Sequence, residues 1–163
     1  MTYRICFVCT GNICRSPMAE SVFRARTAEA GLDGLVEVDS AGTGGWHEGE
    51  PADPRTVAVL RAHDYGSAHV ARQFQQSWFS RLDLVVALDL GHLKALRRLA
   101  PTEQDAAKVR LLRSYDPAAG DDLDVPDPYY GGGEGFEEVL EMVEAASTGL
   151  LAAVREHLEG RAA

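Results

Sequence analysis

A short segment near the amino terminus, residues 9–16, places a thiol and a guanidinium in one turn of chain: it starts at Cys9 and ends with Arg15 and Ser16. The segment follows an apolar run and precedes Pro17, where we expect a helix to begin. Backbone N–H groups and the helix dipole at such an N-terminus attract anions, and the same positive field stabilises a thiolate. Arg15 adds a planar fork of donors that matches phosphate oxygens. The segment therefore predicts a phosphate site in which Cys9 is a nucleophile.

The residues between Cys9 and Arg15 supply consecutive backbone amides that can surround an oxyanion. Gly11 and Asn12 tolerate the positive φ that such a turn needs. Taken alone, Cys9 can also be read as a small buried residue that ends a strand, but the nearby Arg15 and the helix start favour a reactive thiol. We assign phosphate binding to the whole run that ends at the arginine: Thr10, Gly11, Asn12, Ile13, Cys14 and Arg15.

Ser16 has two compatible roles in this pattern. It stands directly before Pro17, which is the position of a helix N-cap. Its hydroxyl is also near enough along the chain to reach the Cys9 sulfur. A hydroxyl that donates to the sulfur would stabilise the thiolate that leaves when a phosphocysteine breaks down.

The elements that must position these residues alternate between strand and helix. Short runs of β-branched or apolar residues predict strands at residues 3–8, 35–38, 82–88 and 109–112. Helical periods predict helices over about residues 17–30, 53–63, 89–99 and 134–158. This order favours an α/β fold of three layers, a doubly wound sheet of four parallel strands flanked by helices, flavodoxin-like or Rossmann-like. Ligands of such sheets bind beyond the carboxyl ends of the strands, which is where Cys9 stands.

Two stretches interrupt this pattern and should be loops, at residues 40–52 and 114–133. Both follow predicted strands, so we expect both to border the Cys9 site. Trp46 in the first loop and Tyr129 and Tyr130 in the second are suited to the walls of a pocket for a phenyl ring, with ordinary packing as the alternative. The second loop holds five candidate proton donors, among which composition does not choose: Asp116, Asp121, Asp122, Asp124 and Asp127.

The totals predict one soluble domain over residues 1–163, without an apolar run long enough to cross a bilayer. The formal charge of −9 argues against a nucleic-acid or membrane partner. No signal-peptide pattern precedes the first strand, so we expect a cytoplasmic protein, and we expect a monomer or weak dimer. The three cysteines all lie within residues 6–14, which indicates neither a disulfide framework nor a metal site.

These motifs together resemble the low-molecular-weight protein tyrosine phosphatase family in its bacterial type. Residues 9–16 match the family's Cys-(five residues)-Arg-Ser/Thr loop. Residues 40–43, with Trp46 and His47, match its second loop, and residues 127–130 match its Asp-Pro-Tyr-Tyr acid loop. The resemblance covers nearly the whole chain, and the combination of motifs is much more specific than the Cys-(five residues)-Arg pattern alone.

The resemblance implies a protein-tyrosine-phosphatase that uses no cofactor and acts on phosphotyrosine-containing proteins and aryl phosphates. Cys9 would attack phosphorus, Arg15 and the loop amides would hold the phosphate oxygens, and Asp127 would serve as general acid and base. Because Asp127 must be protonated while Cys9 is ionised, we expect a bell-shaped pH–rate profile on the acidic side of neutral. Ile13 joins Trp46, Tyr129 and Tyr130 as an expected pocket residue, and Asn12, Ser40 and His69 resemble the family's supports of the loop.

Cys14 shares the loop with the proposed nucleophile. It would then be able to form a disulfide with an oxidised Cys9 and so protect it from irreversible oxidation; a packing role is the alternative. The other histidines are expected to be structural or solvent-facing: His47, His63, His92 and His157.

Three other functions remain open at this point. Arsenate reductases of related fold need further cysteines in a later segment, and this chain has none after Cys14. Protein-arginine phosphatases share the loop but carry Thr where Ile13 stands, and the apolar Ile13 favours an aryl ester. A non-catalytic module that binds phosphate or a flavin would gain nothing from a nucleophile such as Cys9.

Overall fold

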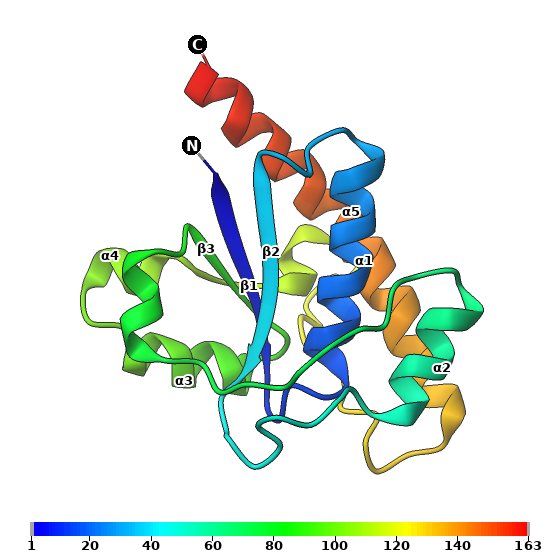
Figure 1. Ribbon diagram of the computed structural model, residues 1–163. Coiled ribbons are helices and arrows are strands. Elements are labelled where there is room, and N and C mark those ends of the chain that lie inside the picture. The colour runs from blue at the N-terminus through cyan, green and yellow to red at the C-terminus, as the bar shows by residue number, and fades with distance from the viewer. Residues whose placement is uncertain (1, 163) are drawn as a thin grey trace.

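The computed structural model describes residues 2–162 as a four-stranded parallel sheet between two layers of helices (Figure 1). The strands are β1 (Tyr3–Cys9), β2 (Val36–Gly42), β3 (Leu84–Ala87) and β4 (Val109–Leu111), in the order β2-β1-β3-β4. All three strand pairs are parallel, which confirms the predicted fold class. The chain adds β2 on one side of β1 and β3 on the other, so the sheet changes winding direction at the carboxyl end of β1.

The helices form the two outer layers. They are α1 (Arg15–Glu29), α2 (Pro54–Ala62), α3 (Leu90–Leu99), α4 (Glu103–Ala107) and α5 (Gly133–Ala162), with 3-10 helices η1 (Gln76–Ser80) and η2 (Leu112–Tyr115). In Figure 1, α1, α2 and α5 lie on one side of the sheet, and α3 and α4 lie on the other. The side chains of β1 alternate between the two cores: Phe7 packs into the cluster with α1 and α5, and Val8 into the cluster with α3.

The strand β2 is longer than expected and reaches Gly42. Its last three residues pair in register with the buried end of β1, so that Ser40 lies beside Phe7 and Gly42 beside Cys9. The prediction that the loop begins at residue 40 was therefore wrong. Small and polar residues there look like turn residues, but pairing with a central strand overrides their weak local preference.

The starts of α2 and α3 are as predicted, because Asp53 accepts a hydrogen bond from the Arg55 N–H (2.8 Å) and Asp89 from the His92 N–H (2.9 Å). The start of α1 is not. That helix begins at Arg15, its N-cap position is Cys14, and no side chain caps it. The N-cap role predicted for Ser16 was wrong, since Ser16 lies inside the first turn.

The short helices η1, α4 and η2 were missed, because an element of four or five residues is too short to show a period. Among the helices described within residues 2–162, none has both the length and the apolar character that a membrane span requires.

Candidate active site

The loop from Cys9 to Arg15, called the Cys9 loop below, joins the carboxyl end of β1 to the first turn of α1. Asn12 lies in it at φ 59°, in the left-handed region that asparagine tolerates better than most residues. Gly11 does not adopt the positive φ that we expected. A Cβ at Gly11 would instead lie 2.9 Å from Cδ2 of His47. Gly11 therefore provides room for His47 rather than a special backbone conformation.

Groups outside the loop hold both the side chain and the backbone carbonyl of Asn12. Its Nδ2 donates to Ser16 Oγ (2.8 Å) and to Ser40 Oγ (3.0 Å), and its Oδ1 accepts from the Arg72 N–H (3.0 Å). Its carbonyl oxygen accepts from His69 Nε2 at 2.7 Å. Burial lowers the pKa of His69, so this ring is neutral at pH 7 and donates through Nε2. Strand β2 and the segment at residues 69–72 thus fix the loop from behind.

Cys9 is 3% exposed, and its Sγ lies 2.9 Å from Ser16 Oγ. The Ser16 hydroxyl also lies 3.3 Å from the Ala41 carbonyl oxygen. Because no side chain caps α1 at Cys14, the N–H groups of its first turn lack a side-chain acceptor at the end of the helix that attracts anions. The loop therefore combines a shielded thiol with an open helix N-terminus.

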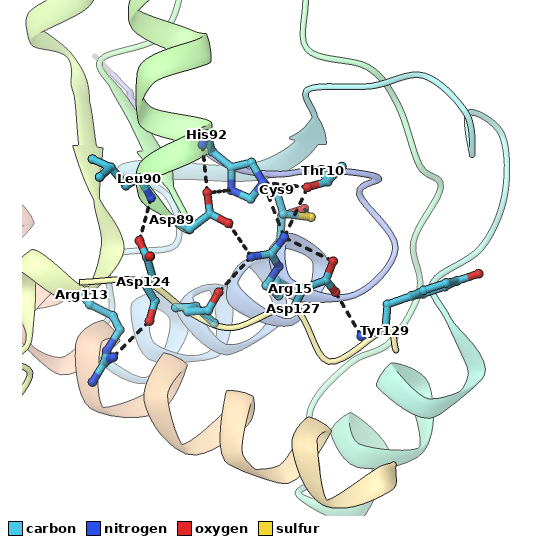
Figure 2. Close-up of polar contacts among 12 residues, drawn as sticks. Cys9, Thr10, Arg15, Asp89, Leu90, His92, Arg113, Asp124, Asp127 and Tyr129 are labelled. Atoms are coloured by element: carbon cyan, nitrogen blue, oxygen red, sulfur yellow. Dashed lines mark hydrogen bonds and ion pairs between the residues drawn. The ribbon is translucent and has the colours of Figure 1, made fainter. Parts of the chain in front are cut away.

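Arg15 is 3% exposed and is held on several sides (Figure 2). Its Nη1 makes an ion pair with Asp89 Oδ2 (2.8 Å) and donates to the Val125 carbonyl oxygen (2.9 Å). Its Nη2 donates to Thr10 Oγ1 (3.3 Å) and lies 3.7 Å from Asp127 Oδ2. A buried guanidinium needs such a counter-charge, and the fixed partners leave its orientation little freedom.

Two of these neighbours, Asp89 and His92, were not predicted as site residues. Burial alone would raise the pKa of Asp89, but the His92 N–H and the Arg15 guanidinium hold it below its ordinary value. His92 is 5% exposed, and its Nε2 lies 2.8 Å from Thr10 Oγ1 and 3.5 Å from Arg15 Nη2. We expected His92 to be structural or solvent-facing, whereas the structure packs it against the Cys9 loop. One signal was available: both residues follow a buried parallel strand, at the edge where ligands bind.

The loop between η2 and α5 is anchored to the end of β3, because the Val125 N–H donates to the Leu88 carbonyl oxygen (2.8 Å). The Asp124 carboxylate is occupied by the Leu90 N–H (2.8 Å), as Figure 2 shows. Asp127 is the one of the five candidate aspartates that lines the pocket above the Cys9 loop. The geometry therefore favours Asp127 among the residues that composition left open.

The pocket above the Cys9 loop has a volume of about 340 Å³. Trp46 and Tyr130 stand at its rim, since they are 75% and 90% exposed, and Tyr129 is 40% exposed. The rings of Tyr129 and Tyr130 meet edge to face, with centroids 5.1 Å apart. The lining includes one histidine that we had expected to be structural or solvent-facing, His47. The full lining is Cys9, Thr10, Gly11, Ile13, Cys14, Arg15, Trp46, His47, Asp127, Tyr129 and Tyr130.

Known proteins resemble this chain over nearly its whole length. The family model described as low molecular weight phosphotyrosine protein phosphatase matches residues 4–160. The chain belongs to that family. A low molecular weight protein-tyrosine-phosphatase from Streptomyces coelicolor is 84% identical to this phosphatase over 164 residues, with all of both chains covered.

Two further relatives are more distant. The low molecular weight protein-tyrosine phosphatase A of Mycobacterium tuberculosis is 51% identical over 147 residues, which are 90% of this phosphatase and 88% of the relative. A crystal structure of a protein tyrosine phosphatase from Entamoeba histolytica superimposes with a TM-score of 0.91 at 34% identity, covering 96% of this chain and 99% of that one.

The other thiols of the phosphatase are buried and free. Burial raises the pKa of Cys14 to about 12, and the negative charge of Asp53 adds to this effect. Cys14 is thus a neutral thiol within the loop at pH 7. In the described part of the phosphatase, no group of three or more His, Cys, Asp or Glu side chains is placed to hold a metal ion.

Proposed function

We propose that this phosphatase hydrolyses phosphotyrosine in proteins in two steps, through a phosphocysteine on Cys9. The observation that carries the proposal is one pocket that holds a shielded thiol, a fixed guanidinium and a carboxylate: Cys9, Arg15 and Asp127. Each is a group that phosphate-ester hydrolysis needs: Cys9 and Arg15 stand at the two ends of the Cys9 loop, and Asp127 comes from the loop between η2 and α5.

In the first step, the Cys9 thiolate attacks phosphorus and the tyrosine oxygen leaves. Arg15 and the amides of the Cys9 loop hold the other phosphate oxygens, where negative charge is concentrated. Asp127, 3.7 Å from Arg15 at the mouth of the same pocket, gives its proton to the departing phenolate. Asp89 neutralises Arg15 from the other side and keeps its fork aimed at the loop.

In the second step, water attacks the phosphocysteine and Asp127, now ionised, accepts a proton from that water. The bond from phosphorus to sulfur breaks, and the Cys9 thiolate leaves. Ser16, whose Oγ lies 2.9 Å from Sγ, donates a hydrogen bond that stabilises this thiolate.

The pocket walls support an aryl ester as the substrate. Trp46, Tyr129 and Tyr130 are placed to flank a flat ring that carries the phosphate to Cys9. Ile13 adds an apolar surface beside them, which supports an aryl ester over a guanidinium-linked phosphate. The absence of any cysteine after Cys14 gives the disulfide relay of an arsenate reductase no residues to use.

The test uses phosphotyrosine peptide and phenyl phosphate with native protein, Cys9→Ser and Asp127→Ala. Cys9→Ser should have no measurable turnover. Asp127→Ala should lose about 10²- to 10⁴-fold in kcat/KM and should lose the alkaline limb of the pH profile, where the native acid becomes deprotonated. Asp121→Ala, a change in the same loop outside the pocket, is the matched control and should behave as native. Turnover by Cys9→Ser, or an alkaline limb unchanged in Asp127→Ala, would contradict the proposed roles.

We also propose that the enzyme is a cytoplasmic monomer or weak dimer. Support comes from the three cysteines, which are all free thiols, as is usual for proteins of a reducing compartment. Light scattering of the purified protein measures the oligomeric state, and a stable higher oligomer would contradict this part of the proposal.

A further inference from the structure

Arg55, the second residue of α2, lies between the two loops that carry the nucleophile and the acid. None of the motifs in the sequence pointed to it. Its guanidinium makes a two-pronged contact with Asp53: Nε lies 3.0 Å from Oδ1 and Nη2 lies 2.9 Å from Oδ2. This fork-to-carboxylate pairing fixes the plane of the guanidinium.

Asp53 connects this pair to the Cys9 loop. The Asp53 N–H donates to the Ile13 carbonyl oxygen at 2.9 Å, and the Asp53 side chain is 8% exposed. The Arg55 side chain holds the pKa of Asp53 below its ordinary value, so the carboxylate stays ionised and paired. The Asp53–Arg55 pair is therefore attached to the backbone of the Cys9 loop.

The remaining guanidinium nitrogen reaches the opposite loop. Nη1 of Arg55 donates to the carbonyl oxygens of Tyr129 (3.1 Å) and Gly131 (3.3 Å). The guanidinium also lies over two rings, 5.4 Å from the centroid of Tyr129 and 4.5 Å from that of Phe136. Arg55 thus holds both the backbone and the ring of Tyr129.

Tyr129 in turn holds the acid. Its N–H donates to Oδ1 of Asp127 at 3.0 Å, while Oδ2 of the same carboxylate lies 3.7 Å from Arg15. A continuous set of contacts therefore runs from the Cys9 loop through Asp53 and Arg55 to Tyr129 and Asp127. Its length sets the separation between the nucleophile loop and the proton donor.

We propose that Arg55 is a positioning residue that keeps Asp127 at the distance from Cys9 required for proton transfer to the leaving group. The proposal rests on the proposed roles of Cys9 and Asp127. Arginine suits this task because its planar fork can bind Asp53 with two nitrogens and the carbonyl oxygens with a third, whereas the single ammonium of lysine cannot span both sets. A displaced acid should slow only those reactions in which the departing oxygen needs a proton.

The experiment compares kcat/KM for two substrates in native protein and Arg55→Met. Phenyl phosphate releases a strongly basic phenolate that needs the acid, whereas 2,4-dinitrophenyl phosphate releases a weakly basic one that does not. For Arg55→Met we expect a loss of about 10-fold or more with phenyl phosphate and near-native values with 2,4-dinitrophenyl phosphate. Equal losses with both substrates, or none with either, would overturn the proposal.

A double-mutant comparison separates this inference from the proposed function. In an Asp127→Ala background, Arg55→Met should cause no further loss with phenyl phosphate, because the group that it positions is gone. A further loss in that background would show that Arg55 acts on something other than Asp127. If Asp127→Ala itself keeps native activity toward phenyl phosphate, then the proposed function fails and not merely the role of Arg55.

Two more variants complete the design. Arg55→Lys should show a smaller loss of kcat/KM with phenyl phosphate and again near-native values with 2,4-dinitrophenyl phosphate. If Arg55→Met does not fold, Arg55→Lys is the deciding variant. A native ratio of kcat/KM for the two substrates in Arg55→Lys would overturn the proposal. Arg81→Met is the matched control, because Arg81 also lies over a ring, 5.0 Å from the centroid of Trp78, but lines no part of the pocket. It should leave both substrates at native kcat/KM.

Discussion

The Oγ atom of Ser16 lies 2.9 Å from Sγ of Cys9 and accepts a hydrogen bond from Nδ2 of Asn12 at 2.8 Å. Because Nδ2 of Asn12 can only donate, the Ser16 hydroxyl hydrogen is left to point to the sulfur or to the Ala41 carbonyl oxygen, which is 3.3 Å away. The sulfur is the closer of the two, and when ionised it is the stronger acceptor. Asn12 therefore prepares Ser16 to donate to the thiolate.

We expect Ser16→Ala to slow breakdown of the phosphocysteine by about 10- to 100-fold, which is the range for loss of one hydrogen bond to a charged group. Pre-steady-state assays with an aryl phosphate should show a burst that approaches one phenol per enzyme, because the second step becomes limiting. Ser147→Ala, a buried change in α5, is the control and should keep native kcat. A Ser16→Ala enzyme with raised KM but native kcat would contradict this role.

His92 should make stability depend on pH. Burial, and then the charge of Arg15, lower its pKa from 6.5 to about 4, against the opposing charges of Asp89, Asp124 and Asp127. As the pH falls from 6.5 toward 4, the unfolded chain binds a proton that the folded protein does not, so the free energy of unfolding decreases. The expected contribution at pH 4.5 is about 2 kcal/mol.

Urea unfolding at pH 7 and pH 4.5 measures this effect. His92→Gln keeps a polar side chain near Thr10 and should lose less stability between the two pH values than native protein, by about 2 kcal/mol. The exposed His157→Gln should keep the native pH dependence. If native protein and His92→Gln lose the same free energy of unfolding, His92 is not the titrating group.

Oxidation should reveal different roles for the two thiols of the Cys9 loop, Cys9 and Cys14. We expect peroxide to inactivate native enzyme reversibly, with a Cys9–Cys14 disulfide found by peptide mapping and activity restored by a dithiol. Because the Cys14 thiol is neutral at pH 7, the disulfide should form faster as the pH rises. Cys14→Ser should accumulate sulfinic Cys9 instead and should not recover. Cys6→Ser, a change on the other face of β1, is the control and should recover as native. Sulfinic Cys9 as the main product in native protein would contradict protection by Cys14.

The aromatic rim should determine which phosphate esters are accepted. One ring contact contributes about 1 kcal/mol, so Tyr130→Ala should raise KM for a phosphotyrosine peptide about 5-fold. Inhibition by inorganic phosphate should be unchanged, since phosphate alone does not contact the ring. Phosphoserine peptides should be poor substrates of native enzyme, because their shorter side chain does not reach Cys9 past the rim; turnover equal to that of phosphotyrosine peptides would disprove this.

Local sequence was enough to predict the Cys9 loop, since a buried strand, a short turn and a helix start are contiguous from Tyr3 to Pro17. The same is true of the start of α2, where the Asp53 side chain binds the N–H of Arg55 two residues later. These features depend on neighbours in the chain, which a sequence displays directly.

Contacts between distant segments explain what was missed. Asp89 and His92 lie 74 and 77 residues from Arg15, and Arg55 lies 74 residues from Tyr129. No spacing rule brings such pairs together before the sheet order is known. The N-cap role of Ser16 was predicted wrongly because α1 begins one residue earlier, at Arg15, and the Ser16 hydroxyl contacts Asn12 and Ala41 instead.

The contacts that hold Asn12 have a consequence for the rate of folding. Its partners Ser40 and Arg72 lie 28 and 60 residues along the chain, so the Cys9 loop is not held in shape until β2 and the segment after α2 have docked. Parallel strand pairing of this kind is slow compared with helix formation. During refolding from denaturant, enzymatic activity should therefore return after the far-ultraviolet helix signal, so that the catalytic loop is among the last parts of the molecule to mature.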